Sequence, residues 1–149
     1  MGAWGVEALE SDEGLDVLHL IFHAQRDKWT LSDMFELLRE NDYMPENPAD
    51  VDFFYDTAYI TVAEMLVEYI KDGSISYETS VNNKETTLII SDITYNDNDL
   101  MYLIDALTKL VRPLDEPHEF YLTWEDSDSF EEWKTHVSSL IDSLIDLKS

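Results

Sequence analysis

The chain has 149 residues and carries 33 Asp and Glu against 9 Lys and Arg, which gives a formal net charge of −24. Such a charge repels nucleic-acid phosphates, and the few basic residues form no patch, so nucleic-acid binding is excluded. Cysteine is absent, which excludes disulfides, thiolate metal sites and cysteine nucleophiles. Hydrophobic residues make up 44% of the chain, too many for a disordered acidic tail, so we expect one folded domain over residues 1–149.

The sequence also bears on location and on the origin of the charge. No apolar run approaches the roughly 20 residues of a membrane span, and the residues after Met1 lack the basic and apolar regions of a secretory signal. We therefore expect a cytoplasmic protein that binds no membrane. Adaptation to high salt is a less favoured origin of the charge, because the acids gather in certain segments instead of replacing surface lysines evenly.

The first half of the chain predicts three helices. Ser11 is a candidate N-cap for a first helix that ends near Gln25, and Thr30-x-x-Asp33 resembles a capping box that begins a second. The two prolines of residues 41–53 predict a loop, and a third helix follows from about residue 54 to 72, ended by Gly73. Its expected polar side, opposite Ala58, Val62, Met65, Leu66 and Tyr69, consists of Thr61, Glu64, Glu68 and Lys71.

The second half predicts a hairpin and two further helices. Residues 75–92 change to a period of two around a turn at Asn82-Asn83, which favours a small β-hairpin. A fourth helix is expected from near Asp97, capped by Asn96 or Asp97, and a fifth after the apparent capping box Ser129-x-x-Glu132. The fold class is therefore mainly α, with about five helices around one core and a small β-hairpin between the third and fourth helices.

Motifs for catalysis are weak. His19 and His23 lie four residues apart on the first predicted helix, which could present two metal ligands, yet no third ligand or HExxH pattern accompanies them. The glycines form no phosphate-binding loop, and no Gly-x-Ser-x-Gly sequence occurs. We therefore predict no catalytic residues, no resident metal and no cofactor. A small metal-dependent enzyme that uses the His19/His23 face remains the alternative.

Two segments mix acidic with aromatic residues, which suits a protein interface because charges steer encounter and buried rings supply binding energy. The preferred partner-binding residues are Asp115, Glu116, Glu119, Tyr121, Trp124, Glu125, Asp126, Asp128, Glu131 and Glu132. The second candidate segment places Asp42, Glu46, Asp50, Asp52 and Asp56 beside Tyr43, Phe53, Phe54 and Tyr55. Both segments predict a basic protein partner.

The opening MGAWGVEALESDEGLDVL resembles the start of a bacterial family catalogued as a domain of unknown function, number 4259. Members begin MG-x-WG-x-G-x-(F/L)-(E/D)-(N/S)-D-x-(A/G)-x-D-(F/W/V)-L, a pattern matched here by Met1, Gly2, Trp4, Gly5, Leu9, Glu10, Ser11, Asp12, Gly14, Asp16 and Leu18. Residues 58–66, residues 99–110 and the spacing of Trp124 and Trp133 are also similar to the family. Within the motif, we expect Trp4 to pack as a lid on the core and Ser11 to fix the helix start.

The resemblance brings no activity with it, but it suggests a class of protein. Small acidic members of such families are similar in size and charge to cytoplasmic immunity proteins that neutralise polymorphic toxins. The sequence therefore favours an immunity protein that inhibits a cognate basic antibacterial toxin by occluding its active or substrate-binding surface. A folded acidic adaptor without a toxin partner is the third possibility, and the sequence leaves the oligomeric state open.

Overall fold

The computed structural model describes residues 12–24, 26–47, 50, 52–81, 84–113 and 116–148. Within these residues the chain forms six α-helices and two small two-stranded sheets. The elements are α1 (Asp12–His23), β1 (Lys28–Thr30), α2 (Leu31–Glu40), α3 (Phe53–Asp72), β2 (Ile75–Val81), β3 (Lys84–Ile90), β4 (Asp92–Thr94), α4 (Asp97–Val111), α5 (Glu119–Glu125) and α6 (Phe130–Asp146). The predicted roles of Trp4, Ser11 and the Asn82-Asn83 turn lie outside the described residues.

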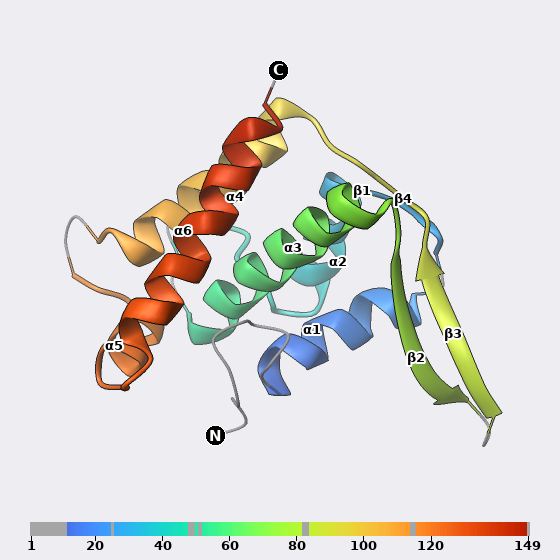
Figure 1. The fold of residues 1–149 in the computed structure, drawn as a ribbon, viewed down its shortest axis with the longest axis horizontal. Helices are drawn as coiled ribbons and strands as arrows, with labels where there is room; N and C mark the ends of the chain where they lie inside the picture. Colours follow the sequence, from blue (N-terminus) through green and yellow to red (C-terminus); the bar gives the residue numbers. More distant parts are fainter. Residues whose placement is uncertain are drawn as a thin grey trace.

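Helix α3 is the central element, and the other helices surround it (Figure 1). It contacts α1, α4, α6 and β2, so most of its circumference faces protein. The prediction of a polar outer side on this helix was therefore wrong in part: Thr61 is fully buried and Glu64 is 7% exposed. Thr61 Oγ1 donates a hydrogen bond to the Thr57 carbonyl at 2.8 Å, which satisfies its hydroxyl inside the core. Glu68 and Lys71, near the end of the helix, are exposed as expected.

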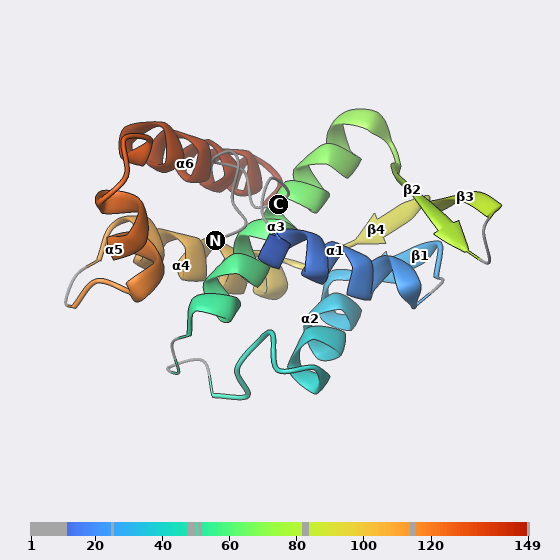
Figure 2. The ribbon, with the colours of Figure 1, turned by 90° about the horizontal axis from the view of Figure 1, so that it is seen from below.

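Helices α4, α5 and α6 pack together on one side of α3, while α1, α2 and the hairpin lie on the other (Figure 2). Helix α6 buries one apolar stripe, from Trp133 through Val137 to Leu144. Helix α5 was not expected, so the described residues contain six helices where the sequence predicted five. The helix has seven residues and buries only Phe120 in the core. It is too short for a 3.6-residue period of apolar positions to be visible in the sequence.

The hairpin lies between α3 and α4, as predicted, and projects from the helical body (Figure 1). Its strands β2 and β3 are antiparallel, with Ile75 opposite Ile90 and Tyr77 opposite Leu88. Ile75 and Ile90 are buried, which anchors the base of the hairpin to the core. The parallel pair of β1 and β4, which joins Trp29 to Ile93 in register, was not predicted, since each strand has three residues.

The helix ends follow the expected capping chemistry at most positions. Thr30 forms the predicted capping box with Asp33, and the Asn96 side chain accepts a hydrogen bond from the Asp99 amide at 2.8 Å. The capping box predicted at Ser129 is absent, because Ser129 has φ −101° and ψ 15° and its side chain makes no cap hydrogen bond. An N-cap residue needs an extended backbone for its side chain to reach the first turn, and Ser129 instead belongs to the turn after α5.

Gly73 ends α3 in the left-handed region with φ +81°, and its amide donates to the Tyr69 carbonyl at 2.7 Å. We expect Gly73→Ala to lower the free energy of unfolding by about 1 kcal/mol, because an L side chain strains this backbone conformation. No atom lies within 4 Å of the added Cβ, so the loss measures backbone strain alone. Urea denaturation followed by circular dichroism provides the test. Gly73→Asn is the matched control and should cost less, since asparagine tolerates positive φ; equal losses would contradict this origin.

Candidate functional site

The acids of the preferred segment form an exposed surface over α5, the turn that follows it and the start of α6. We call this surface, residues 116–132, the α5–α6 surface. Its exposed carboxylates are Glu116, Glu119, Glu125, Asp126, Asp128, Glu131 and Glu132. The last five cluster where α5 turns into α6, whereas Glu116 and Glu119 lie at the opposite end of α5, about 10 Å away. Asp115 lies outside the described residues.

The aromatic residues of this surface are packed against one another. The rings of Trp124 and Trp133 are stacked with an interplanar angle of 5° and centroids 5.9 Å apart. Tyr121 meets Phe130 edge-on at 5.3 Å and Trp133 at 6.1 Å. Tyr121 and Trp124 are therefore only partly exposed, because they hold α5 against α6. This platform fixes the positions of the surrounding carboxylates.

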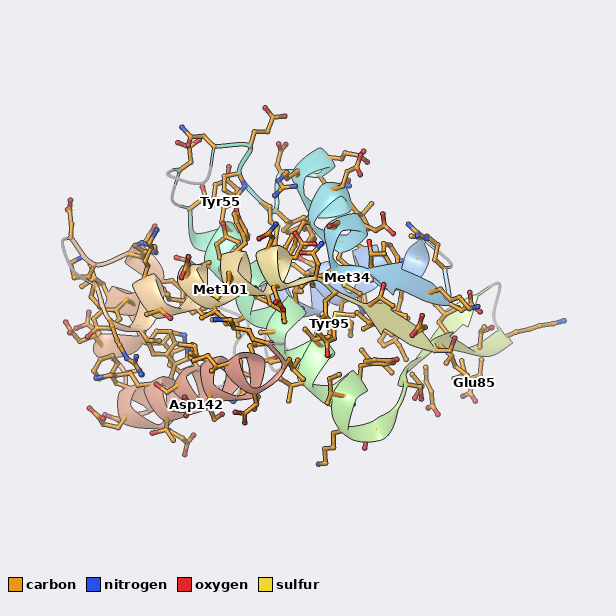
Figure 3. All side chains as sticks on the ribbon, turned by 90° about the horizontal axis from the view of Figure 1, so that it is seen from above. Met34, Tyr55, Glu85, Tyr95, Met101 and Asp142 are labelled. Atoms are coloured by element: carbon orange, nitrogen blue, oxygen red, sulfur yellow. The ribbon has the colours of Figure 1, made fainter. Side chains whose placement is uncertain are left out.

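The charges of the α5–α6 surface are not neutralised within the described residues. None of its carboxylates forms an ion pair with a Lys or Arg there. Lys134 of α6 lies instead over the Phe130 ring, with its Nζ 5.1 Å from the ring centroid. Acidic side chains also project over the rest of the molecule, for example Glu85 of the hairpin and Asp142 of α6 (Figure 3). Neighbouring exposed acids repel one another, so a cation that approaches this surface gains energy from several charges together.

The second predicted segment divides in the structure. Asp42, Glu46, Asp50 and Asp52 are exposed, and Asp52 also caps α3 by accepting a hydrogen bond from the Phe54 amide at 2.9 Å. Asp56 does not belong to this surface: it is 2% exposed, because it lies one turn into the central helix and faces inward. Among the rings of this segment whose side chains the structure describes, Phe54 is half-exposed, and it packs edge-on against Tyr43.

Two buried carboxylates of α3 pair with histidines from the C-terminal part of the chain. Asp56 Oδ2 lies 2.9 Å from His118 Nδ1, at the start of α5, and Glu64 Oε2 lies 2.7 Å from His136 Nε2 on α6. Burial raises the pKa of Asp56 from 3.8 to about 6, while the neighbouring His118 opposes that rise. These two pairs connect the α5–α6 surface to the central helix.

His19 and His23 do not form a metal centre in the described part of the chain. The Tyr77 hydroxyl of the hairpin is hydrogen-bonded to His19 Nε2, and the ring centroids of the two histidines are 6.0 Å apart. The described residues contain no group of three or more His, Cys, Asp or Glu side chains that could hold a metal ion. The geometry instead assigns His19 to the contact between α1 and the hairpin.

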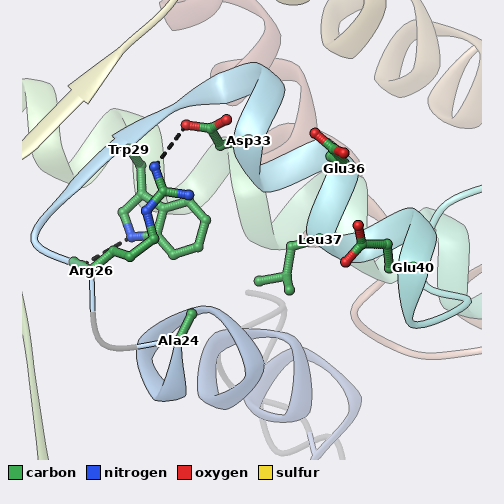
Figure 4. Close-up of a pocket in the computed structure, with 7 residues that line it drawn as sticks. All are labelled: Ala24, Arg26, Trp29, Asp33, Glu36, Leu37 and Glu40. Carbon is green, nitrogen blue, oxygen red and sulfur yellow. Dashed lines mark hydrogen bonds and ion pairs between the residues drawn. The ribbon is translucent and has the colours of Figure 1, made fainter.

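A groove between the end of α1 and α2 was not anticipated from the sequence (Figure 4). It has a volume of about 260 Å³ and is lined by Ala24, Arg26, Trp29, Asp33, Glu36, Leu37 and Glu40. The Arg26 guanidinium lies 4.4 Å from the centroid of the Trp29 ring and pairs with Asp33 at 2.9 Å. The Arg26 side chain holds the pKa of Asp33 below its usual range.

Comparison with known proteins places the chain in a family. The model of the family described as a domain of unknown function, DUF4259, matches residues 2–136. The chain belongs to this family. No curated protein and no solved structure matches it significantly. Across the described residues of this DUF4259 protein, no helix is both long and apolar enough to cross a membrane.

Sequence reasoning missed two buried pairs and a groove in this DUF4259 protein. The partners in the two buried pairs are separated by 62 and 72 positions, and nothing in the local sequence joins them. In the groove, Arg26 and Asp33 are seven residues apart across a strand and a helix start. An arginine three positions before a tryptophan was the one available local signal, and it occurs too commonly to indicate a site.

Proposed function

We propose that this protein is a cytoplasmic immunity protein that binds a cognate basic antibacterial toxin and occludes its active or substrate-binding surface. The observation that carries the proposal is the α5–α6 surface, where five exposed carboxylates cluster beside a packed aromatic platform and none of them forms an ion pair with a Lys or Arg among the described residues. Such an arrangement favours fast, electrostatically steered association with a basic surface.

The platform matters because it reduces the cost of binding. The stacked Trp124 and Trp133 and the edge-on Tyr121 fix α5 relative to α6, so the carboxylates between them need little ordering on association. Leu122, 45% exposed on α5, adds apolar area next to these charges. A basic partner would therefore contact carboxylates at the rim of the α5–α6 surface and an apolar side chain nearer its centre.

The experiment that tests this function uses the neighbouring gene. The protein is co-expressed with the C-terminal domain encoded by an adjacent large open reading frame, and growth is compared with and without it. Protection, together with a purified one-to-one complex, is the expected result. An intact toxic domain that neither binds the protein nor is neutralised by it would refute the proposal for that pair, and an adaptor role would then take its place.

We expect charge reversal on the α5–α6 surface to weaken toxin binding by at least tenfold, about 1.4 kcal/mol. The variant is Glu125→Lys/Asp126→Lys/Asp128→Lys, which replaces attraction by repulsion at the centre of the cluster. Binding kinetics at two salt concentrations provide the measurement, and the association rate of the unchanged protein should fall as salt rises. The matched control, Asp42→Lys/Glu46→Lys/Asp50→Lys, makes the same charge change on the other segment and should do less. A larger effect of the control would move the interface to residues 41–54.

A further inference from the structure

The hairpin that projects from the helical body has two strands, so each strand has one paired edge and one outer edge (Figure 1). Val81 and Lys84 pair across only two intervening residues, which makes them a hydrogen-bonded pair. Hydrogen-bonded and non-hydrogen-bonded pairs alternate along an antiparallel ladder. The backbone N–H and C=O groups of Glu85, Thr87 and Ile89 therefore point away from β2. We call this row of backbone groups the β3 edge.

The β3 edge has no partner strand within the described part of the chain. None of its backbone groups hydrogen-bonds to another described residue, and β1 pairs with β4, which follows β3. Natural proteins protect such edges with proline, bulges, central lysines or a covering element. Strand β3 contains no proline, its pairing with β2 runs without a bulge, and its single lysine stands at the first position. The β3 edge is therefore open to a further strand.

The residues of the β3 edge also present their side chains to solvent. Glu85, Thr87 and Ile89 share one face of the hairpin, and all three are exposed, with Ile89 51% exposed. The alternate residues face the core, since Leu88 is half-buried and Ile90 is buried. A strand added to this edge would place alternate side chains directly beside Glu85, Thr87 and Ile89.

Charge distinguishes between the strands that fit this edge. Glu85 and Glu78, which belongs to β2, lie on the same exposed face, and neither forms an ion pair with a described residue. A second copy of the chain would bring the same acids and its own formal net charge of −24, so repulsion opposes self-pairing. A strand with a basic residue beside Glu85 and an aliphatic residue beside Ile89 gains attraction and apolar burial instead.

We propose that the β3 edge binds an extended segment of a basic protein by antiparallel strand addition. The segment exchanges backbone hydrogen bonds with Glu85, Thr87 and Ile89, and it has a lysine or arginine four positions after an aliphatic residue. The backbone bonds supply affinity, and the two side chains supply selectivity. This site is separate from the α5–α6 surface, and it does not require the partner to be a toxin.

The test titrates the peptide acetyl-Thr-Val-Thr-Thr-Thr-Lys-Thr-amide into the ¹⁵N-labelled full-length protein. In antiparallel register its valine, central threonine and lysine lie beside Ile89, Thr87 and Glu85. We expect saturable chemical-shift changes centred on β3. N-methylation of the fourth peptide residue blocks an amide that faces β3 and should weaken binding at least about tenfold. N-methylation of the third residue blocks a solvent-facing amide at equal charge and should change binding by less than about threefold. Equal weakening by the two methyl groups would overturn the proposal.

Matched proline variants test the same edge from the side of the protein. Thr87→Pro removes an outward N–H of β3 and should weaken peptide binding at least about tenfold, whereas Ser76→Pro makes the same change on the outer edge of β2 and should change it by less than about threefold. Neither proline removes a bond between the two strands, so persisting contacts between Ile75 and Ile90 confirm the hairpin.

Three results would refute strand addition by a basic segment. They are equal weakening in the two proline variants, shifts scattered over the acidic surface, and β3 shifts that depend on protein concentration without peptide, which would identify a second copy as the occupant. The N-methylated peptides leave the protein unchanged, so they decide the question even if Thr87→Pro disrupts the hairpin. Because no toxin takes part, failure here leaves the immunity proposal standing, and failure of the growth-protection assay leaves the β3 edge standing.

Discussion

Replacing Trp133 with alanine is expected to lower the free energy of unfolding by about 3–5 kcal/mol, the largest loss we predict for any single side chain. Trp133 is fully buried, and its ring meets those of Phe120, Tyr121, Trp124 and Phe130 at centroid distances between 5.9 and 6.3 Å. Removing it leaves a cavity between α5 and α6 that these rings can fill only by moving. Since whole domains are stable by about 5–15 kcal/mol, the variant should unfold at much lower urea concentrations.

A phenylalanine at the same position separates ring packing from hydrogen bonding. Trp133 Nε1 is buried without a hydrogen-bond partner among the described residues, so Trp133→Phe removes an unsatisfied donor along with part of the ring. We expect it to cost clearly less than the alanine variant in urea denaturation followed by far-ultraviolet circular dichroism. If the two variants lose the same free energy of unfolding, the Trp133 N–H has a hydrogen-bond partner whose loss matters. If the alanine variant loses less than about 1 kcal/mol, the buried position of the ring is contradicted.

Local signals predicted much of this fold. The capping box at Thr30, the asparagine cap at Asn96 and the glycine at 73 each act within one helical turn, so their chemistry is visible in a few consecutive letters. The alternation after residue 75 indicated the hairpin, since side chains of a strand point to opposite faces in turn. The helices α2, α4 and α6 were predicted, and each lies at the periphery and buries one face.

The errors come from elements whose environment is set by distant residues. Helix α3 is surrounded, so Thr61 and Glu64 are buried at positions that would face solvent on a peripheral helix. Their polar groups are accommodated by the Thr57 carbonyl and by His136, and the latter is supplied by a helix 72 positions away. Helix α5 and the β1–β4 pair are too short to show a period, and packing and pairing stabilise them.

The candidate surface was predictable in composition but not in shape. Acid density indicated a charged surface over residues 115–132, and each described carboxylate among them is exposed. The sequence could not show that Tyr121 and Trp124 turn toward Trp133, because that depends on how α5 folds back on α6. It also placed Asp56 among exposed acids, whereas the central position of α3 buries that carboxylate beside His118.

Burial of Asp56 should make the stability of the protein depend on pH. The pKa of Asp56 is raised from 3.8 to about 6, mainly by desolvation, so the native state binds its proton more tightly than the unfolded chain does. Where the native state holds more protons, the free energy of unfolding falls as pH rises. The contribution of this carboxyl is therefore greatest below about pH 4 and is lost between about pH 4 and 6, by about 3 kcal/mol in all.

Asp56→Asn isolates this contribution, because asparagine keeps the size and a hydrogen-bonding oxygen for His118 Nδ1 but does not titrate. We expect the variant to gain on the unchanged protein by about 3 kcal/mol between pH 4 and pH 7, since titrating groups that do not contact Asp56 are shared and cancel in the difference. Urea denaturation at half-unit pH steps measures it. Asp50→Asn removes an exposed acid and is the control; its difference in stability from the unchanged protein should be nearly independent of pH.

If Asp56→Asn instead loses stability relative to the unchanged protein as pH rises, the attraction between ionised Asp56 and protonated His118 outweighs desolvation. In that case the pair would hold α5 to α3 as an ion pair and not as a neutral hydrogen bond.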